Sequence, residues 1–252
     1  MWRKQLSLSA SVTQRPPRHR FPALSCQDSQ LIRELVQVDH HGSGPFKIQA
    51  VHQPAERAEA STLLARRYAW RGYTVQPLES GSLDGITLCA TTDQLMLATI
   101  TANPDAGQGL YVEHLYPEVV QSIRNGGGRL CEFTRFAVDE SVRSPTLLGA
   151  IFHVACLYVM EVHGCTEALI EVNPRHVSFY KQMLGFTEAG EERLDPAVNA
   201  AAVLLRLDLR HCAREIERLG GRRDAGRRER SFYPFFFARE EAEGIVRMLQ
   251  HY

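Results

Sequence analysis

Hydrophobic and polar residues follow two periods along this chain, and the two periods predict strands and helices in turn. Runs that alternate, or that are continuously apolar and β-branched, predict strands over 46–52, 86–92, 95–102, 129–138, 165–172, 186–193 and 201–209. Helical spacing, with Pro near the start and Gly past the end, predicts helices over 31–38, 54–73, 117–124, 146–162, 173–184 and 240–252. This order predicts an α/β fold with a mixed central sheet flanked by helices.

The two ends of the chain differ in composition from its middle. Residues 1–44 are rich in Ser, Pro and Arg and hold no acid before Asp28, which is typical of a mostly disordered, basic tail. An organelle transit peptide is the alternative interpretation. We expect one domain over 45–209 and an extension over 210–252, which is Arg-rich at first and then strongly aromatic over 231–237.

The aromatic stretch is expected to pack back on the domain, because exposed patches of that kind are rare in monomers. Covering an acyl site or forming an oligomer contact are the alternatives. The Arg-rich part, 210–230, is ordinarily a solvated helix and linker. It is also the densest basic run near the domain, which makes it a candidate docking face for an acidic partner protein.

Composition excludes some classes of function. The net charge is zero, so no general affinity for nucleic acid or for a membrane surface is expected. The apolar run 146–162 contains His153 and Glu161, which favours a buried helix over a membrane span. The six cysteines form no close pairs, which favours reduced thiols and a cytoplasmic protein. The histidines have no metal-like spacing, so no metal site is predicted.

The strand 129–138 carries one acid and one base, Glu132 and Arg135, among apolar residues. Residues three apart in a regular strand point to opposite faces, so these two share a face only if a bulge re-aims one of them. The alternative is a cross-strand ion pair. The polar loop 139–145 precedes a long helix, whose free N–H groups can bind an anion.

Three segments resemble those of a known family. Glu132-Phe133-Thr134-Arg135 resembles the Glu-x-x-Arg strand of N-acyl-homoserine lactone synthases, and it is more similar to the related long-chain N-acyl amino acid synthases. The same family's motifs are matched by Asn173-Pro174-Arg175-His176, Phe179-Tyr180 and Leu184-Gly185-Phe186. Leu63 to Tyr68 resembles its first-helix motif, with Arg67 as the motif Arg and Arg66 as the alternative register. The resemblance covers roughly residues 46–209 and implies the GNAT fold of acyl-CoA N-acyltransferases.

Two departures from acetyltransferases of that fold change the expected donor and site. Their loop for the coenzyme A pyrophosphate, Gln/Arg-x-x-Gly-x-Gly/Ala, is reduced here to Arg143 and Gly149, and Pro145 removes one backbone donor. A carrier-protein phosphopantetheine has one phosphate and asks for less, so acyl carrier protein is expected over coenzyme A. Tyr180 keeps its spacing from Asn173, but Gly185-Phe186 comes one residue late, which turns a helix by about 100°.

The resemblance implies an acyltransferase that moves a fatty acyl group from a phosphopantetheine thioester to the amine of an amino acid. The implied catalytic residues are Glu132 as base or ammonium anchor, Arg135, and Tyr180 as acid for the thiolate. The implied substrate-binding residues are Arg67, Arg143, Phe133, Thr134 and Asn173. No tightly bound cofactor is expected; acyl carrier protein and the amino acid are the partners. The alternatives are acetyl transfer from acetyl-coenzyme A, homoserine lactone synthesis, and a non-catalytic scaffold that binds an acyl ligand or a protein.

Overall fold

A computed structural model of the chain describes residues 34–38, 45–69, 85–93 and 95–251. All of them belong to one compact unit, Ile32–Tyr252. The remaining residues include most of the predicted N-terminal tail, and predictions that fall on them lie outside the described part.

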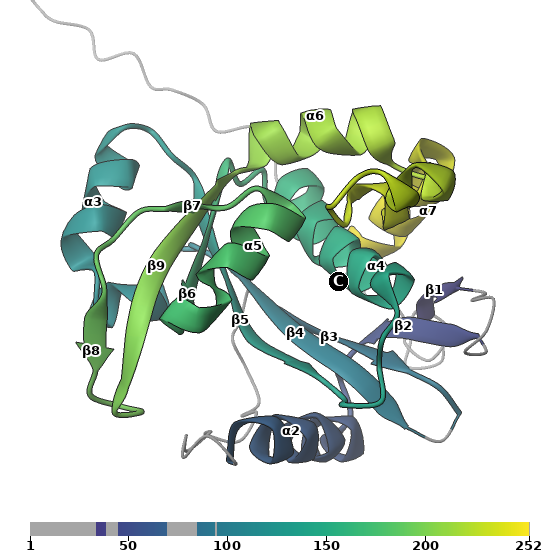
Figure 1. Cartoon of the computed structure of the whole chain (residues 1–252), viewed down its shortest axis with the longest axis horizontal. Coiled ribbons are helices and arrows are strands. Elements are labelled where there is room, and N and C mark those ends of the chain that lie inside the picture. The colour runs from purple at the N-terminus through teal and green to yellow at the C-terminus, as the bar shows by residue number, and fades with distance from the viewer. Residues whose placement is uncertain (1–33, 39–44, 70–84, 94, 252) are drawn as a thin grey trace, which may run out of the picture. The chain divides into compact units, whose positions relative to one another are not determined.

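A mixed sheet forms the middle layer (Figure 1). Its strands are β1 (Glu34–Val38), β2 (Phe46–Ala50), β3 (Ile86–Thr91), β4 (Met96–Pro104), β5 (Leu130–Val138), β6 (Glu167–Val172), β7 (Thr187–Glu188), β8 (Arg193–Asp195) and β9 (Ala200–Asp208). Their order is β1-β2-β3-β4-β5-β6-β9-β7, with β8 also paired to β9. Among these strands β5 and β6 form the parallel pair, and the other pairs are antiparallel.

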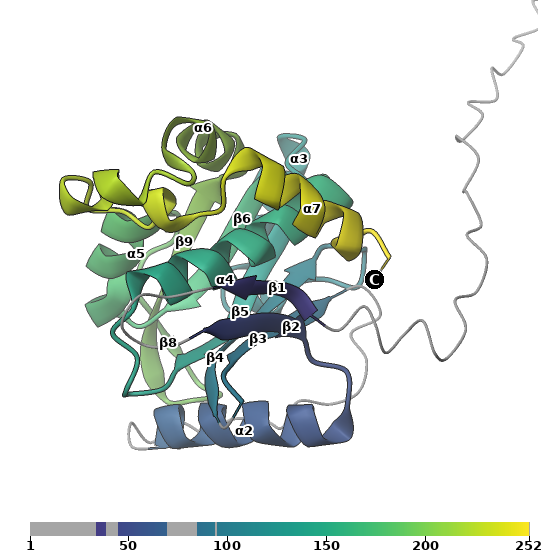
Figure 2. The ribbon, with the colours of Figure 1, turned by 90° about the vertical axis from the view of Figure 1, so that its right-hand side faces the viewer.

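Helices cover both faces of the sheet (Figures 1 and 2). They are α2 (Pro54–Ala69), α3 (Pro117–Asn125), α4 (Pro145–Leu157), α5 (Val177–Leu184), α6 (Leu209–Leu219) and α7 (Arg239–Leu249). α2 and α3 pack their apolar residues on one face. α4 and α5 pack on the other, and α7 lies against α4. The two faces of the central strands therefore meet different helices.

The central helix α4 is continued by a π-helical turn, η2 (Tyr158–Val162). Together they are the one segment in the described part of the chain that is long and apolar enough to cross a membrane. However, 72% of it is buried inside the protein, so it is the core helix that the sequence predicted and not a membrane span.

Two sequence predictions were wrong. Residues 34–38 form the edge strand β1 and not a helix, because Leu35 and Val38 are buried where the segment pairs with β2; tertiary pairing outweighs local propensity here. The strand expected over 186–193 is reduced to the short β7 and to the start of β8. Its chain is interrupted at Gly190, where an added Cβ would lie 2.6 Å from the ring of Tyr116.

The C-terminal extension packs back on the domain, as predicted. Phe232, Tyr233, Phe236 and Phe237 are all buried and belong to the same core cluster as α4. The extension's backbone is also tied to α4, because Phe237 N–H donates to Nδ1 of the buried His153 at 2.9 Å. The aromatic stretch is therefore part of the core.

Candidate active site

The parallel strands β5 and β6 separate in the middle of the sheet. They pair only between Leu130–Glu132 and Glu167–Leu169, and beyond this point each continues without the other as a partner (Figure 1). After Glu132 one edge of β5 stays paired with β4, and the other edge, which paired with β6, faces the gap. Phe133 and Thr134, two of the predicted substrate-binding residues, lie in this segment.

A β-bulge follows in the same strand. Thr134 pairs with Thr101 but Ala137 pairs with Thr99, so β5 has one extra residue there. Arg135 has a left-handed backbone, with φ of 52°. From α2, the hydroxyl of Tyr68 donates to Phe136 O at 3.0 Å and holds the bulge.

Glu132 lies where the strands separate, on the face that α2 and α3 cover. Its side chain is 3% exposed. One oxygen accepts from Asn103 Nδ2 and the other from Val112 N–H, each at 3.2 Å. Burial raises the pKa of Glu132; these hydrogen bonds and the charge of Arg135 oppose the rise. Glu132 and Arg135 are thus coupled electrostatically.

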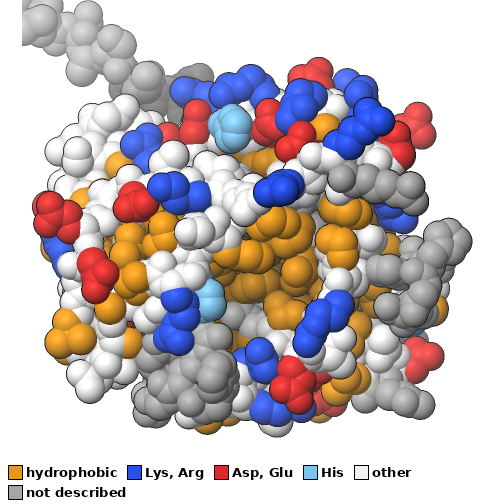
Figure 3. Space-filling model, viewed as in Figure 1, with side chains coloured by type: hydrophobic (Ala, Val, Ile, Leu, Met, Phe, Trp, Pro, Cys, Tyr) orange, Lys and Arg blue, Asp and Glu red, His pale blue; other side chains and the backbone are white. Residues whose placement is uncertain are grey.

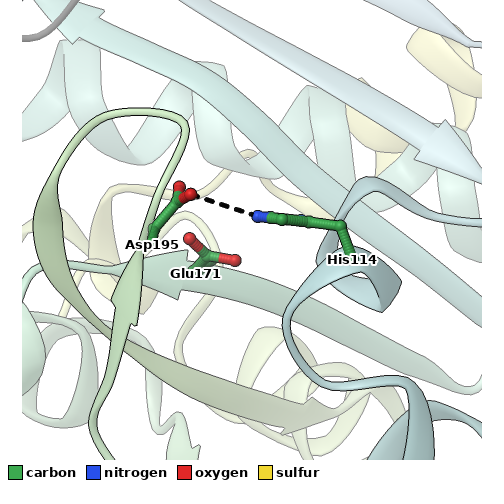
Figure 4. Close-up of side chains that lie close together, drawn as sticks. All are labelled: His114, Glu171 and Asp195. Atoms are coloured by element: carbon green, nitrogen blue, oxygen red, sulfur yellow. Dashed lines mark hydrogen bonds and ion pairs between the residues drawn. The ribbon is translucent and has the colours of Figure 1, made fainter.

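Three more titratable side chains gather on the same face: Glu171 of β6, Asp195 of β8 and His114 of the 3₁₀ turn η1 (Tyr111–His114) (Figure 4). One ring nitrogen of His114 and one oxygen atom of each carboxylate all lie within 4.8 Å of one another. Burial, and then Asp195, raises the pKa of Glu171 to about 7. Sequence reasoning missed this cluster. Its members are far apart in the chain and lie in none of the motifs.

The loop before α4 carries Arg143, the predicted phosphate ligand. Ser144 caps the helix by accepting from Leu147 N–H at 3.1 Å, and Pro145 occupies the first turn. Arg143 is exposed and donates to the carbonyls of Glu140 and Val142. Its guanidinium therefore lies at the N-terminal end of α4, which is the favourable end for an anion.

The last turn of α2 reaches the same loop. Arg66 forms an ion pair with Asp139, and Arg67 Nη1 lies 3.6 Å from Glu140 Oε2. The structure therefore places both arginines beside the loop that precedes α4. The first-helix prediction concerned substrate groups, and these contacts leave it untested.

Asn173 and Tyr180 follow β6, the strand on the other side of the gap; Asn173 comes directly after β6 and Tyr180 lies in α5. Asn173 caps the next turn by accepting from Arg175 N–H at 3.3 Å, as predicted, and donates to Ala201 O at 3.1 Å. Tyr180 packs edge-to-face against Phe186. Burial, and then the nearby Tyr68, raises the pKa of Tyr180, so the phenol keeps its proton.

A hydrophobic hollow opens beside the gap. Figure 3 shows it at the centre of one face, between α4 and α5 on one side and β4 and β5 on the other, with basic side chains around its rim. Partly buried apolar side chains of α4 and α5, including Leu148 and Met183, pack against the core cluster. The apolar hollow and the polar cluster thus lie on opposite faces of the sheet, near the place where β5 and β6 separate.

Comparisons with known proteins agree with this geometry. Residues 59–208 match the family model described as N-acyl amino acid synthase FeeM. The solved structure of FeeM, an N-acyl amino acid synthase from uncultured soil microbes, is 26% identical with a TM-score of 0.59, covering 66% of this chain and 92% of that one.

Other solved structures are more distant. The AHL synthase LasI is 14% identical (TM-score 0.49, 65% of this chain and 90% of that one). An acyl-CoA N-acyltransferase from Pseudomonas aeruginosa is 15% identical (TM-score 0.47, 64% and 98%). No curated protein sequence matches the chain significantly.

Proposed function

Because this chain belongs to the family of FeeM N-acyl amino acid synthases, we propose that it transfers a fatty acyl group from a phosphopantetheine thioester to the α-amine of an amino acid. The family makes the chain an acyltransferase that forms N-acyl amino acids. The observation that carries the proposal is the opening between β5 and β6, with Glu132 on one side of the sheet and the apolar hollow beside α4 on the other.

Glu132 is the proposed base for the acceptor, or the anchor of its ammonium. Only a neutral amine attacks a thioester, so a proton must leave first. Burial raises the pKa of Glu132, which makes the carboxylate a stronger base than an exposed one. As the amine adds to the carbonyl carbon, the oxyanion accepts from a backbone N–H of the segment Phe133–Thr134, which faces the gap.

Arginines are proposed to hold the acceptor's carboxylate. Arg135 lies at the bulge of β5, its charge lowers the pKa of Glu132, and a guanidinium binds a carboxylate through two parallel hydrogen bonds. Arg67, in the last turn of α2, already lies next to the exposed carboxylate of Glu140, which a carboxylate of the substrate can replace. Tyr180, whose phenol keeps its proton, is the proposed acid for the departing thiolate, and Asn173 fixes the start of its helix.

Acyl carrier protein is the proposed donor, in the cytoplasm. Pro145 removes a backbone donor from the first turn of α4, and Arg143 is the one basic side chain of that loop. This suits the single phosphate of a carrier-protein arm better than a pyrophosphate. The cysteines in the described part of the chain are free and buried, as expected in a reducing compartment.

The test is product formation. Cells that overexpress the chain should accumulate new N-acyl amino acids in lipid extracts analysed by mass spectrometry. Glu132→Gln should lower turnover by about 100-fold with an unchanged thermal midpoint. Glu192→Gln, an exposed carboxylate on the loop before β8, is the matched control. Acetylated products alone, or wild-type turnover by Glu132→Gln at saturating acceptor, would contradict the proposal.

A further inference from the structure

One short turn connects the proposed base with the neighbouring acidic cluster. At the start of η1, the N–H of Val112 donates to Glu132. At its end, His114 faces Asp195, with Nε2 3.4 Å from Oδ1. Glu171 follows Leu169 by two residues, and Leu169 is the β6 partner of Glu132, so both glutamates face the same side of the sheet.

The hydrogen bonds show that this cluster must hold a proton. Nδ1 of His114 lies 2.5 Å from the carbonyl oxygen of Tyr111, which can only accept, so Nδ1 carries hydrogen. In a neutral imidazole Nε2 is then an acceptor, yet it faces the carboxylate of Asp195. Either the imidazole or one of the two carboxyls is therefore protonated. Glu171 Oε2 is buried and has no hydrogen-bond partner among the described residues. Such an atom is suited to a substrate group or to a proton that comes and goes.

The cluster leads from the interior to solvent. Asp195 is buried, with its side chain 3% exposed, whereas the side chain of His114 is 31% exposed. The groups that face it are Glu132 of β5, Tyr111 of η1 and the three members themselves. The pKa of Glu171 lies at about 7. Burial opposes the shift of His114, but the bonds to Tyr111 and Asp195 raise its pKa overall. Glu171 therefore exchanges its proton near neutral pH, and His114 binds a proton more readily than a free imidazole.

We propose that Glu171, Asp195 and His114 form a proton relay, which takes the proton of the acceptor ammonium beside Glu132 and releases it to solvent at His114. This inference rests on the proposed amine site. The ammonium loses one proton to the relay and becomes the nucleophile. Its nitrogen then bonds to the thioester carbonyl carbon, and the carbon–sulfur bond breaks. The second proton of that nitrogen goes to the departing thiolate, so the net products are amide, thiol and one solvent proton.

The experiment compares pH profiles of kcat/KM for the amino acid in purified full-length protein. His114→Gln and Glu171→Gln should each lose about 10- to 100-fold at pH 7, with the KM for acyl donor unchanged. The loss should shrink towards pH 9.5, because a growing share of the acceptor amine is then already neutral and needs no relay. Added imidazole should partly restore His114→Gln, since this side chain is partly exposed.

His251→Gln and Glu192→Gln, both exposed, should match wild type at every pH. A loss by His114→Gln that is equal at pH 7 and 9.5 would make the cluster merely structural, and a wild-type profile would remove the relay. If Glu171→Gln does not fold, His114→Gln decides alone. Activity that a chelator abolishes and zinc restores would reassign the three side chains to a metal. An active wild type with an inactive Glu132→Gln, but with unaffected relay variants, would leave the proposed function standing without the relay.

Discussion

His153 should make the stability of this enzyme depend on pH in a calculable way. The residue lies in α4, is fully buried, and stacks on Phe236 with ring centroids 4.6 Å apart. Its Nδ1 accepts from Phe237 N–H, so the neutral imidazole holds the C-terminal extension against the core helix. Burial lowers the pKa of His153 from 6.5 to about 3.

The sign follows from proton linkage. Above pH 6.5 His153 is neutral in both states. Between pH 6.5 and pH 3 the unfolded chain binds the proton and the folded chain does not. The free energy of unfolding therefore decreases as the pH is lowered. The slope is about 1.4 kcal/mol per pH unit, so His153 removes about 2 kcal/mol at pH 5 relative to pH 8. Glu171 acts in the opposite direction, because its folded pKa is raised and its protonation stabilises the fold.

A matched variant separates the two contributions. His153→Asn keeps an acceptor near Nδ1 but cannot be protonated, whereas Glu171 titrates equally in both proteins. Urea unfolding at pH 8, 7, 6 and 5 gives the two free energies of unfolding. The variant should be less stable at pH 8, and its deficit should shrink by about 2 kcal/mol by pH 5. His251→Asn, an exposed control, should show no such change. A deficit that stays constant from pH 8 to pH 5 would refute a buried neutral His153.

Three further outcomes are expected. Arg135→Ala should raise the KM for the amino acid and, because the Arg135 charge lowers the pKa of Glu132, move the acidic limb of the kcat/KM profile to higher pH; an unmoved limb would uncouple the pair. For one acyl chain, turnover should be higher from acyl carrier protein than from coenzyme A, and equal use would contradict the argument from Pro145. Changing exposed arginines of the basic segment to Ser should raise the KM for acyl carrier protein at low salt. The difference should disappear at high salt, because the Debye screening length is already only about 10 Å at 0.1 M. A KM that is unaltered at low salt would show that the segment is solvated surface. The arginines are Arg222, Arg223 and Arg228.

That docking prediction gains support from where the basic segment lies. The 3₁₀ turn η4 (Arg223–Arg227) contacts the ring of Phe235, since a Cβ at Gly226 would lie 2.5 Å from it. Phe235 in turn lies on Gly149 of α4, where an added Cβ would be 2.7 Å away. The turn η4 is therefore held beside the N-terminal half of α4, which the sequence alone did not show.

Local patterns predicted the elements that depend on local chemistry. Pro145 and Pro174 begin helical segments, Gly185 ends α5 with a left-handed backbone, and the apolar run 146–162 is the core helix. The bulge in β5 was anticipated only as a condition, because residues three apart share a face only with an extra residue between them; the structure has it between Thr134 and Ala137. The sequence failed where distant segments decide. β1 depends on the open edge of β2, and the break at Gly190 depends on Tyr116.

The acidic cluster shows why a site can be half predictable. Glu132 lies in a motif because its strand must both open the sheet and carry a carboxylate. Glu171, Asp195 and His114 have no shared motif, because each needs only a position on a different element, and the crossing of β6, β8 and η1 brings them together. A proton relay tolerates this arrangement, because it needs groups in contact that can gain and lose protons near neutral pH, and it needs no fixed sequence. Its members are therefore found from geometry and hydrogen-bond logic, and the tautomer that Tyr111 imposes on His114 is the step that identifies a shared proton.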